Sequence, residues 1–454
     1  MADMNTVRIV SKSTVRPASG DHGGRIELTP FDLIPLLHSY TQRGLLFHKP
    51  ASTTVGFVER LKAALSRALD VFLPLAGRLE AIEDSDGEVG TASFFIQCNG
   101  EGTLFVHATA EGVAATDVLA EPVAVPEEIF SSFFLMNRVL NCEEAVSELP
   151  LLAVQVTELS DGIFVAYALN HVVADGTGLW HFLNVWSEIS RCGNNEVLPQ
   201  QYSFRRPVFG REFLDGLVDL PLRIPFSRDR IHRGIFPTRT LQSRSFRFSK
   251  EKIAELKAKA NANAAKTGTS NISSLQALMA NLWVCVTRSR HLDPLAEVTK
   301  VVVVGMRPRL EPPLPKEYFG NAIRSAAVKT TAGELLERGM GWAARQMNSA
   351  IAAQTPSEAR KYLQDWVKEI RQQPSDMPAS SLLATGSSPR FDVFGNDFGY
   401  GRPLALRVGP AGQFDGRVLT FPGTEEGSID LEVCLMPEAL CALDNDAEFV
   451  NTLN

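Results

Sequence analysis

The sequence predicts an α/β protein of two domains. Segments with strand periodicity and segments with helical periodicity are mixed in both halves of the 454 residues. Between the halves, residues 192–238 are rich in Arg, Pro and Gly and have little periodicity. The chain is also long enough to bury more than one core. We therefore expect an N-terminal domain over residues 1–191, a crossover loop over 192–238 and a C-terminal domain over 239–454.

The first half combines strands with two helices. Residues Thr6–Arg16 alternate β-branched and polar side chains, which predicts the first strand. Apolar residues at helical spacing predict helices over Thr53–Leu73 and Leu179–Ser190. Further strands are expected at Thr91–Gln97, Leu104–Thr109, Leu151–Leu159 and Ile163–Leu169. The last of these is almost entirely apolar, which is typical of a strand buried on both faces.

The second half is predicted to contain more helices. We expect them at Ile253–Ala265, Ser273–Arg288, Ala332–Ala353, Glu358–Gln372 and Pro437–Asp444, with Ser273 as the N-cap of the second. Strands are expected at Val301–Gly305, Leu419–Phe421 and Ser428–Leu435, the first of them buried.

Composition narrows the class of partner. The chain has 45 Lys and Arg against 52 Asp and Glu, a net charge of -7, which argues against nucleic acid or an anionic membrane as its main partner. We see no secretory signal and no apolar run near the ~20 residues that span a bilayer. The six cysteines form no metal-binding pattern, and most lie in apolar strings as expected of buried free thiols. We therefore expect a cytoplasmic protein without a metal site, whose partner is a small molecule or another protein.

His171 is the strongest candidate for a catalytic residue. It follows the buried strand and precedes a helix, in a turn of small residues, where a side chain can project from a rigid support into a cleft. A neutral imidazole there can take a proton from a hydroxyl or an amine. Asp175, four residues on, can orient this imidazole, cap the following helix or pair with an arginine.

Two further sequence segments, both in the second half, contain candidate partners for His171 and Asp175. Val304-Gly305-Met306-Arg307 joins a strand to a Pro-rich turn that leads to Tyr318-Phe319-Gly320-Asn321. Arg307 can form a buried bidentate pair with a carboxylate, for which Asp175 and Asp397 are the candidates. Asp397 opens Asp397-Phe398-Gly399-Tyr400-Gly401, which lacks the accompanying motifs of a protein kinase.

Together the three strings resemble those of the plant BAHD acyltransferases, whose motifs are H-x-x-x-D-G, Y-F-G-N and D-F-G-W-G. The resemblance extends over essentially the whole chain. With Asn170 before the motif histidine, the sequence resembles a branch of putative acetyltransferases within this family. It implies two chloramphenicol-acetyltransferase-like domains, each a mixed β-sheet with flanking helices, joined by a long crossover loop. It also implies acyl-CoA as co-substrate, a small-molecule acceptor and a monomeric enzyme without a tightly bound cofactor.

The resemblance assigns roles to individual residues. The catalytic set is His171 as general base, with Asp175 and Asp397 as the motif carboxylates. Asp175 is expected to point away from the site and to pair with Arg307, and Asp397 to shape a loop. Supporting positions are Arg307, Asn321, Gly176, Gly399, Tyr400 and Gly401. Ser273 and Ser274 correspond to a segment that borders the CoA.

Two positions depart from the family pattern. Asn170 replaces a more frequent histidine, and Tyr400 replaces tryptophan. We expect both to reshape the pocket without removing the chemistry. The predicted function is acyl transfer from CoA to the hydroxyl or amine of a small plant metabolite. Two alternatives remain: a lyase reaction on a small carboxylated metabolite, and a binding protein without catalysis.

Overall fold

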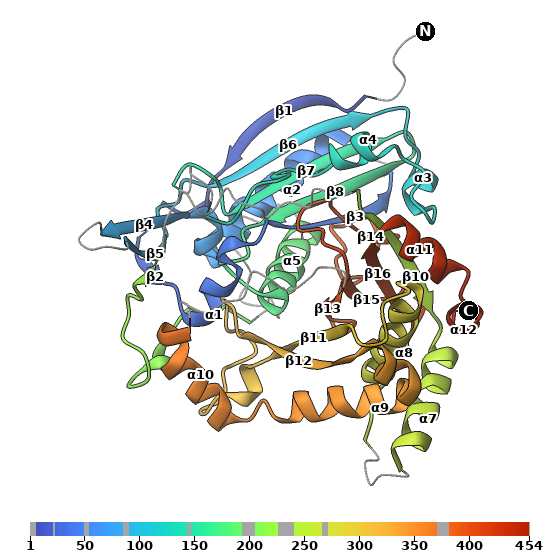
Figure 1. Cartoon of the computed structure of the whole chain (residues 1–454). Coiled ribbons are helices and arrows are strands. Elements are labelled where there is room, and N and C mark those ends of the chain that lie inside the picture. The colour runs from blue at the N-terminus through green and yellow to red at the C-terminus, as the bar shows by residue number, and fades with distance from the viewer. Residues whose placement is uncertain are drawn as a thin grey trace.

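The computed structural model describes residues 6–20, 23–49, 54–84, 90–142, 147–192, 205–225, 240–265, 271–369 and 381–453. Two six-stranded sheets, a smaller sheet and the helices around them form a mixed α/β architecture, as predicted. In Figure 1 the first large sheet lies above the second, and the helix α5 (Gly176–Arg191) lies between them in this view.

The first sheet carries the strand that leads to His171. Its strands, in spatial order, are β1 (Arg8–Val15), β6 (Thr103–Ala110), β7 (Leu152–Leu159), β8 (Gly162–Leu169), β3 (Thr41–His48) and β14 (Ala405–Val408). Only β6 and β7 run parallel; the other neighbours are antiparallel. Every residue of β8 is buried, which confirms the prediction from its apolar sequence. The edge strand β14 comes from the second half of the chain.

Two helices cover one face of this sheet. They are α5 and α2 (Thr54–Val71), and both were predicted from their apolar spacing. Leu61, Leu65 and Leu69 of α2 are fully buried in the same core as Leu183 and Trp186 of α5. The indole Nε1 of Trp186 donates to the backbone oxygen of Leu61 at 3.1 Å, so the polar atom of this core residue is satisfied.

The second sheet lies entirely within the second half. Its order is β10 (Gln242–Phe248), β16 (Ile429–Leu435), β15 (Arg417–Pro422), β13 (Leu382–Ser387), β11 (Glu297–Gly305) and β12 (Ile323–Thr331). Its helices are α7 (Lys250–Ala265), α8 (Ser274–Ser289), α9 (Ala332–Ala352), α10 (Pro356–Glu369), α11 (Pro437–Asp444) and α12 (Ala447–Val450). The predicted helices at these places are confirmed, except that residues 370–372 lie outside the described residues.

One prediction about this sheet was wrong. Val301–Gly305 was expected to be buried, but Val303 is 38% exposed and only Val304 of the five is buried. The reason is that successive side chains of β11 point to opposite faces. Val298 packs into the core that α8 and α9 share, whereas Val303 lies on the opposite face.

A third, small sheet adjoins the first half. It contains β2 (Arg25–Glu27), β5 (Thr91–Gln97) and β4 (Arg78–Asp84), and β9 (Ile224–Pro225) pairs with β5. Short helices connect the elements of this half: α1 (Pro30–Leu33), α3 (Ala115–Leu119) and α4 (Glu127–Ser131).

The predicted crossover segment contacts both halves where it is described. Besides the β9 pairing, Val208 forms a β-bridge with Tyr318 of the second half. Residues 193–204 and 226–239 lie outside the described residues. The division into residues 1–191, 192–238 and 239–454 remains a prediction.

Two chain-wide features bear on the sequence analysis. The six cysteines are free thiols, four buried and two exposed. Among the described helices, none combines the length and the hydropathy that a membrane span requires.

Candidate functional site

His171 lies in the turn between β8 and α5, and two asparagines hold this turn. The backbone nitrogen of His171 donates to Oδ1 of Asn141 at 3.0 Å. The side chain of Asn170 donates to the backbone oxygen of Asn141 at 2.9 Å and accepts from the nitrogen of Val172 at 3.2 Å. The turn is therefore fixed on both sides of the imidazole. Asn170, the first departure from the family pattern, is part of this support.

The environment of His171 favours the neutral imidazole. Burial among protein atoms lowers its pKa, and the positive charge of Arg43 lowers it further. Its own backbone, the charge of Asp175 and the side chain of Asn321 act in the opposite direction. The side chain nevertheless keeps partial access to solvent. A neutral, partly accessible imidazole is the form that accepts a proton.

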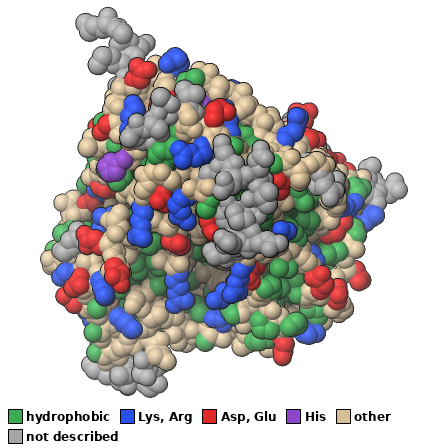
Figure 2. Space-filling model, turned by 180° about the vertical axis from the view of Figure 1, so that it is seen from behind, with side chains coloured by type: hydrophobic (Ala, Val, Ile, Leu, Met, Phe, Trp, Pro, Cys, Tyr) green, Lys and Arg blue, Asp and Glu red, His purple; other side chains and the backbone are tan. Residues whose placement is uncertain are grey.

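His38 is a second neutral imidazole near His171. Burial, together with the charge of His171, lowers the pKa of His38 to about 4. Its side chain is nevertheless exposed. Figure 2 shows a hollow near the middle of the face seen from behind, with Lys and Arg side chains beside it.

Asp175 uses its carboxylate to hold the backbone and not the imidazole. Its Oδ1 accepts from the nitrogens of Thr177 (3.0 Å) and Gly178 (3.2 Å), which caps the N-terminus of α5. Its Oδ2 accepts from the nitrogen of Ala322 at 3.0 Å. Arg307 donates to both oxygens. Of the three roles considered for Asp175, the structure therefore has the helix cap and the arginine pair.

Arg307 connects this cap to the second half of the chain. It lies two residues after the end of β11 and is 7% exposed. Besides the two bonds to Asp175, its Nη2 donates to the backbone oxygens of Tyr318 (2.9 Å) and Gly320 (3.3 Å). One guanidinium therefore holds the start of α5 and the Tyr318–Gly320 loop together.

Asn321 holds the backbone of His171 from the other side. Its Nδ2 donates to the oxygen of His171 at 2.9 Å and to Oδ1 of Asp32 at 3.1 Å, and its backbone nitrogen donates to the same Oδ1 at 2.8 Å. Asp32 is fully buried and also forms a capping box with Thr29 at the start of α1. Asp32 was not among the predicted site residues, although its Thr-x-x-Asp spacing with Thr29 is a capping signal.

Gly176 allows an aromatic ring to approach the cap. A Cβ atom at this position would lie 2.7 Å from Cζ of Phe391, closer than two such atoms can pack. The ring of Phe391 in turn stacks on Trp180 of α5, with centroids 6.3 Å apart. A side chain at Gly176 would therefore require the ring of Phe391 to shift.

Asp397 organises a loop through three backbone bonds. Its Oδ1 accepts from the nitrogens of Gly399 (2.7 Å), Tyr400 (3.0 Å) and Gly401 (3.0 Å). Gly399 and Gly401 have φ values of +100° and +95°, a conformation that side chains disfavour. Tyr400 packs edge-on against Phe57, and its hydroxyl accepts a hydrogen bond from Arg60.

The structure does not bring this loop to His171. A Cβ on Gly399 would lie 3.6 Å from Cα of Arg191, the last residue of α5, and Ser190 donates to the oxygen of Phe398 at 3.0 Å. His171 precedes the first residue of α5. The helix has 16 residues and is therefore about 24 Å long. Asp397 therefore lies near the opposite end of α5 from the imidazole. Its place in the catalytic set remains a prediction.

Ser273 and Ser274 begin α8. Ser273 is exposed and forms a capping box with Gln276: its Oγ accepts from the nitrogen of Gln276, whose side chain accepts from the nitrogen of Ser273. The N-cap prediction is confirmed. The predicted contact of these serines with CoA remains a prediction.

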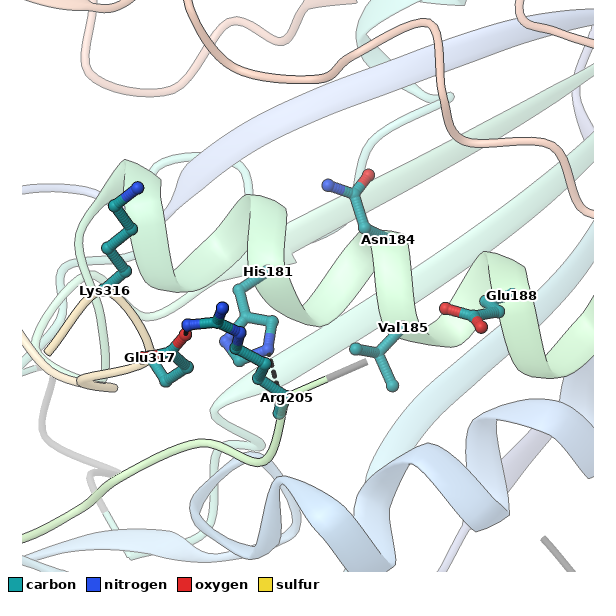
Figure 3. Close-up of a pocket in the computed structure, with 7 residues that line it drawn as sticks. All are labelled: His181, Asn184, Val185, Glu188, Arg205, Lys316 and Glu317. Carbon is teal, nitrogen blue, oxygen red and sulfur yellow. Dashed lines mark hydrogen bonds and ion pairs between the residues drawn. The ribbon is translucent and has the colours of Figure 1, made fainter. Parts of the chain in front are cut away.

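A separate pocket of about 310 Å³ lies beside α5. In Figure 3 its lining side chains come from α5, from Arg205 and from the loop at Lys316 and Glu317. His181 interacts with the backbone oxygen of Arg205 at 2.8 Å, and Arg205 pairs with Glu317. None of the predicted site residues lines this pocket.

The described residues contain no group of three or more His, Cys, Asp or Glu that could hold a metal ion. The site consists of an imidazole on a fixed turn, supported by buried amides and one ion pair. Such an arrangement can accept a proton from a bound hydroxyl or amine.

Comparison with known proteins identifies the family. The model of the Transferase family matches residues 5–450. An uncharacterized acetyltransferase of Arabidopsis thaliana is 40% identical over 98% of this chain and 99% of its own length. The BAHD acyltransferase DCR of the same plant is 32% identical over 98% of this chain and 92% of its own length.

Solved structures share the fold. Vinorine synthase superposes with a TM-score of 0.73 at 20% identity, covering 99% of each chain. TRI101 of F. sporotrichioides, solved with coenzyme A and T-2, has the same TM-score and identity and covers 94% of this chain and 98% of its own. Sequence and fold agree over almost the whole length, and the chain belongs to the Transferase family, as a BAHD acyltransferase.

Proposed function

We propose that this acyltransferase moves an acyl group from CoA to the hydroxyl or amine of a small plant metabolite, with His171 as general base. The observation that carries the proposal is the imidazole itself: it is held on a fixed turn, partly accessible, and kept neutral by its surroundings. The named relatives support the plant setting, since one of them is a putrescine hydroxycinnamoyltransferase of rice and another a shikimate O-hydroxycinnamoyltransferase of tobacco.

In the proposed reaction, acyl-CoA and the acceptor bind together. His171 takes the proton of the acceptor as its oxygen or nitrogen attacks the thioester carbonyl. The tetrahedral intermediate then collapses, the carbon–sulfur bond breaks, and the same imidazole returns the proton to the CoA sulfur. The products are the acylated acceptor and free CoA thiol, so the histidine ends in its starting state.

The remaining site residues act through the position of His171. Asn141 and Asn321 hold its backbone at the nitrogen and at the oxygen. The Arg307–Asp175 pair fixes the start of α5, directly after the turn. In this proposal Asp397, Gly399, Tyr400 and Gly401 stabilise a loop at the far end of α5 and take no part in proton transfer. Preorganisation of this kind keeps a base in its productive position.

Release of free CoA thiol tests the proposal directly. The protein is incubated with a set of acyl-CoAs and a plant metabolite extract, thiol is measured with a chromogenic disulfide, and products are identified by mass. We expect thiol release that depends on an acceptor and a new product heavier by the acyl group. A new product without thiol release would indicate the lyase reaction instead, and failure to bind any acyl-CoA would indicate a protein without catalysis. A cytoplasmic location and a monomeric state belong to the same proposal.

A further inference from the structure

Arg43 is a charged residue on the sheet that leads to His171. It lies on β3 directly opposite Tyr167 of β8, so both side chains are on the same face of the first sheet. Tyr167 packs edge-on against Trp180 of α5, with ring centroids 6.4 Å apart. His171 follows Tyr167 by four residues along the chain. Arg43 therefore lies on the face of the sheet against which α5, the helix after the His171 turn, packs.

The guanidinium of Arg43 has no carboxylate partner among the described residues. Its Nη1 donates to the backbone oxygen of its own neighbour, Gln42, at 2.6 Å. Its central carbon lies 5.4 Å from the ring centroid of Phe421 on β15, in the second half of the chain. The side chain is neither fully buried nor fully exposed. An aromatic ring orients the guanidinium, and donor groups remain for a ligand.

The carboxylate that acts on Arg43, Glu432, has its salt bridge with another arginine. Two carboxylates in this region have their own arginines: Glu432 pairs with Arg417 at 3.0 Å, and Glu121 pairs with Arg407 at 2.9 Å. Glu432 also acts on Arg43, so Arg417 and Arg43 share one carboxylate, and one positive charge of this group is not neutralised. Burial lowers the pKa of Arg43 to about 10, so it still carries its charge at neutral pH.

Two further observations connect Arg43 to a ligand next to His171. Its charge is one of the causes that lower the pKa of His171, so the two side chains are close enough to interact. The hydroxyl of Tyr167, which is 2% exposed, has no hydrogen-bond partner in the described structure. A partly buried cation beside an unsatisfied hydroxyl is an environment that an anion stabilises.

We propose that Arg43 binds the carboxylate of a small-molecule substrate and holds that substrate against His171. The guanidinium matches a carboxylate with two parallel hydrogen bonds. The carboxylate can belong to the acceptor or to the acyl group of the donor, and the two cases share this chemistry. The inference rests on the proposed function, because it names the class of substrate on which His171 acts.

Matched pairs of ligands test the proposal by calorimetry. The donor pair is malonyl-CoA and acetyl-CoA, and the acceptor pairs are 3- and 4-hydroxybenzoate with their methyl esters. Each is titrated into the His171→Ala protein, in which turnover is suppressed, and into the same protein with Arg43→Gln. We expect the acidic member of at least one pair to bind about 10- to 100-fold more tightly than the neutral member. Arg43→Gln should abolish this preference, and Arg43→Lys should keep part of it.

Arg8→Gln is the matched control, because Arg8 is an exposed arginine on the same sheet and its side chain is 67% exposed. It should leave every preference unchanged. An acid preference that survives Arg43→Gln would overturn the proposal, as would the absence of an acid preference in all pairs. An equal loss of affinity for malonyl-CoA and acetyl-CoA would also overturn it, since the anion would then be a phosphate of CoA. These results are independent of thiol release, so they separate a failure of this inference from a failure of the proposed acyl transfer.

Discussion

Arg307 binds both carboxylate oxygens of Asp175, at 2.6 Å from Nη1 to Oδ2 and at 3.0 Å from Nη2 to Oδ1. The two residues are 132 positions apart and come from different halves of the chain. Their pairing joins the turn after β8 to the segment after β11, and both side chains are almost inaccessible to water. Asp175 and Arg307 thus form one structural unit that supports the turn carrying His171.

Arg307→Met should destabilise the protein strongly. It leaves the Asp175 carboxylate buried without its cation, which costs about 3–5 kcal/mol in comparable pairs. The free energy of unfolding from urea titration measures the effect. Arg338→Ala is the control, since Arg338 and Glu334 form an exposed i,i+4 pair on α9, and it should cost less than about 1 kcal/mol. Equal losses for the two variants would contradict the structural role of Arg307.

Gly176→Ala should also destabilise the protein, although alanine is the better helix former. The new methyl group would meet the ring of Phe391, and overpacking of this kind costs about 1–3 kcal/mol. The melting temperature measures the change. Combining the variant with Phe391→Leu should recover part of the loss, because the smaller side chain leaves room for the methyl group. If Gly176→Ala alone is as stable as the wild type, the ring of Phe391 moves aside without a cost in stability.

Substitutions of Asp397 distinguish a loop role from a proton-transfer role. Asparagine keeps an oxygen that can accept from the nitrogens of Gly399, Tyr400 and Gly401, whereas alanine keeps none. We expect Asp397→Asn to retain most of the turnover and Asp397→Ala to lose stability together with activity. Turnover and melting temperature are compared for both variants. If the asparagine variant is folded but as inactive as the alanine variant, Asp397 takes part in the chemistry.

The pH dependence of stability should reflect the lowered pKa values of three histidines, His38, His171 and His181. An unfolded chain protonates them near pH 6.5, whereas the folded chain resists protonation until lower pH, about 4 for His38. The unfolded state therefore binds more protons below pH 6.5, and stability falls as the pH decreases from 6.5 toward 4. His38→Gln should reduce this loss, as measured by melting temperatures across that range. A variant with the same pH dependence as the wild type would show that His38 does not contribute.

Local patterns in the sequence predicted those features that depend on neighbouring residues. The apolar run of β8, the amphipathic faces of α2 and α5, and the N-cap Ser273 follow from periodicity and capping, and the structure contains them. The helix cap and the arginine pair of Asp175 were also among the roles predicted for it, because a carboxylate before a helix has few possible partners.

Contacts between distant segments could not be predicted in this way. The pairing of β14 with β3 joins strands from opposite halves, and no local signal marks it. The hydrogen bonds from Asn321 to Asp32 and from His171 to Asn141 likewise depend on the completed fold. Burial of Val301–Gly305 was overestimated because an apolar strand does not show which of its faces will be covered.

The central claim is that His171 accepts the proton of the acceptor, and turnover of His171→Ala tests it most directly. His181→Ala is the matched control, since His181 lies on α5 in the separate pocket and interacts with a backbone oxygen. Both variants are checked for native circular dichroism, and thiol release is measured at saturating acyl-CoA. We predict that His171→Ala lowers turnover by about 10²- to 10⁴-fold while His181→Ala stays near the wild type. A folded His171→Ala protein with wild-type turnover would contradict the account.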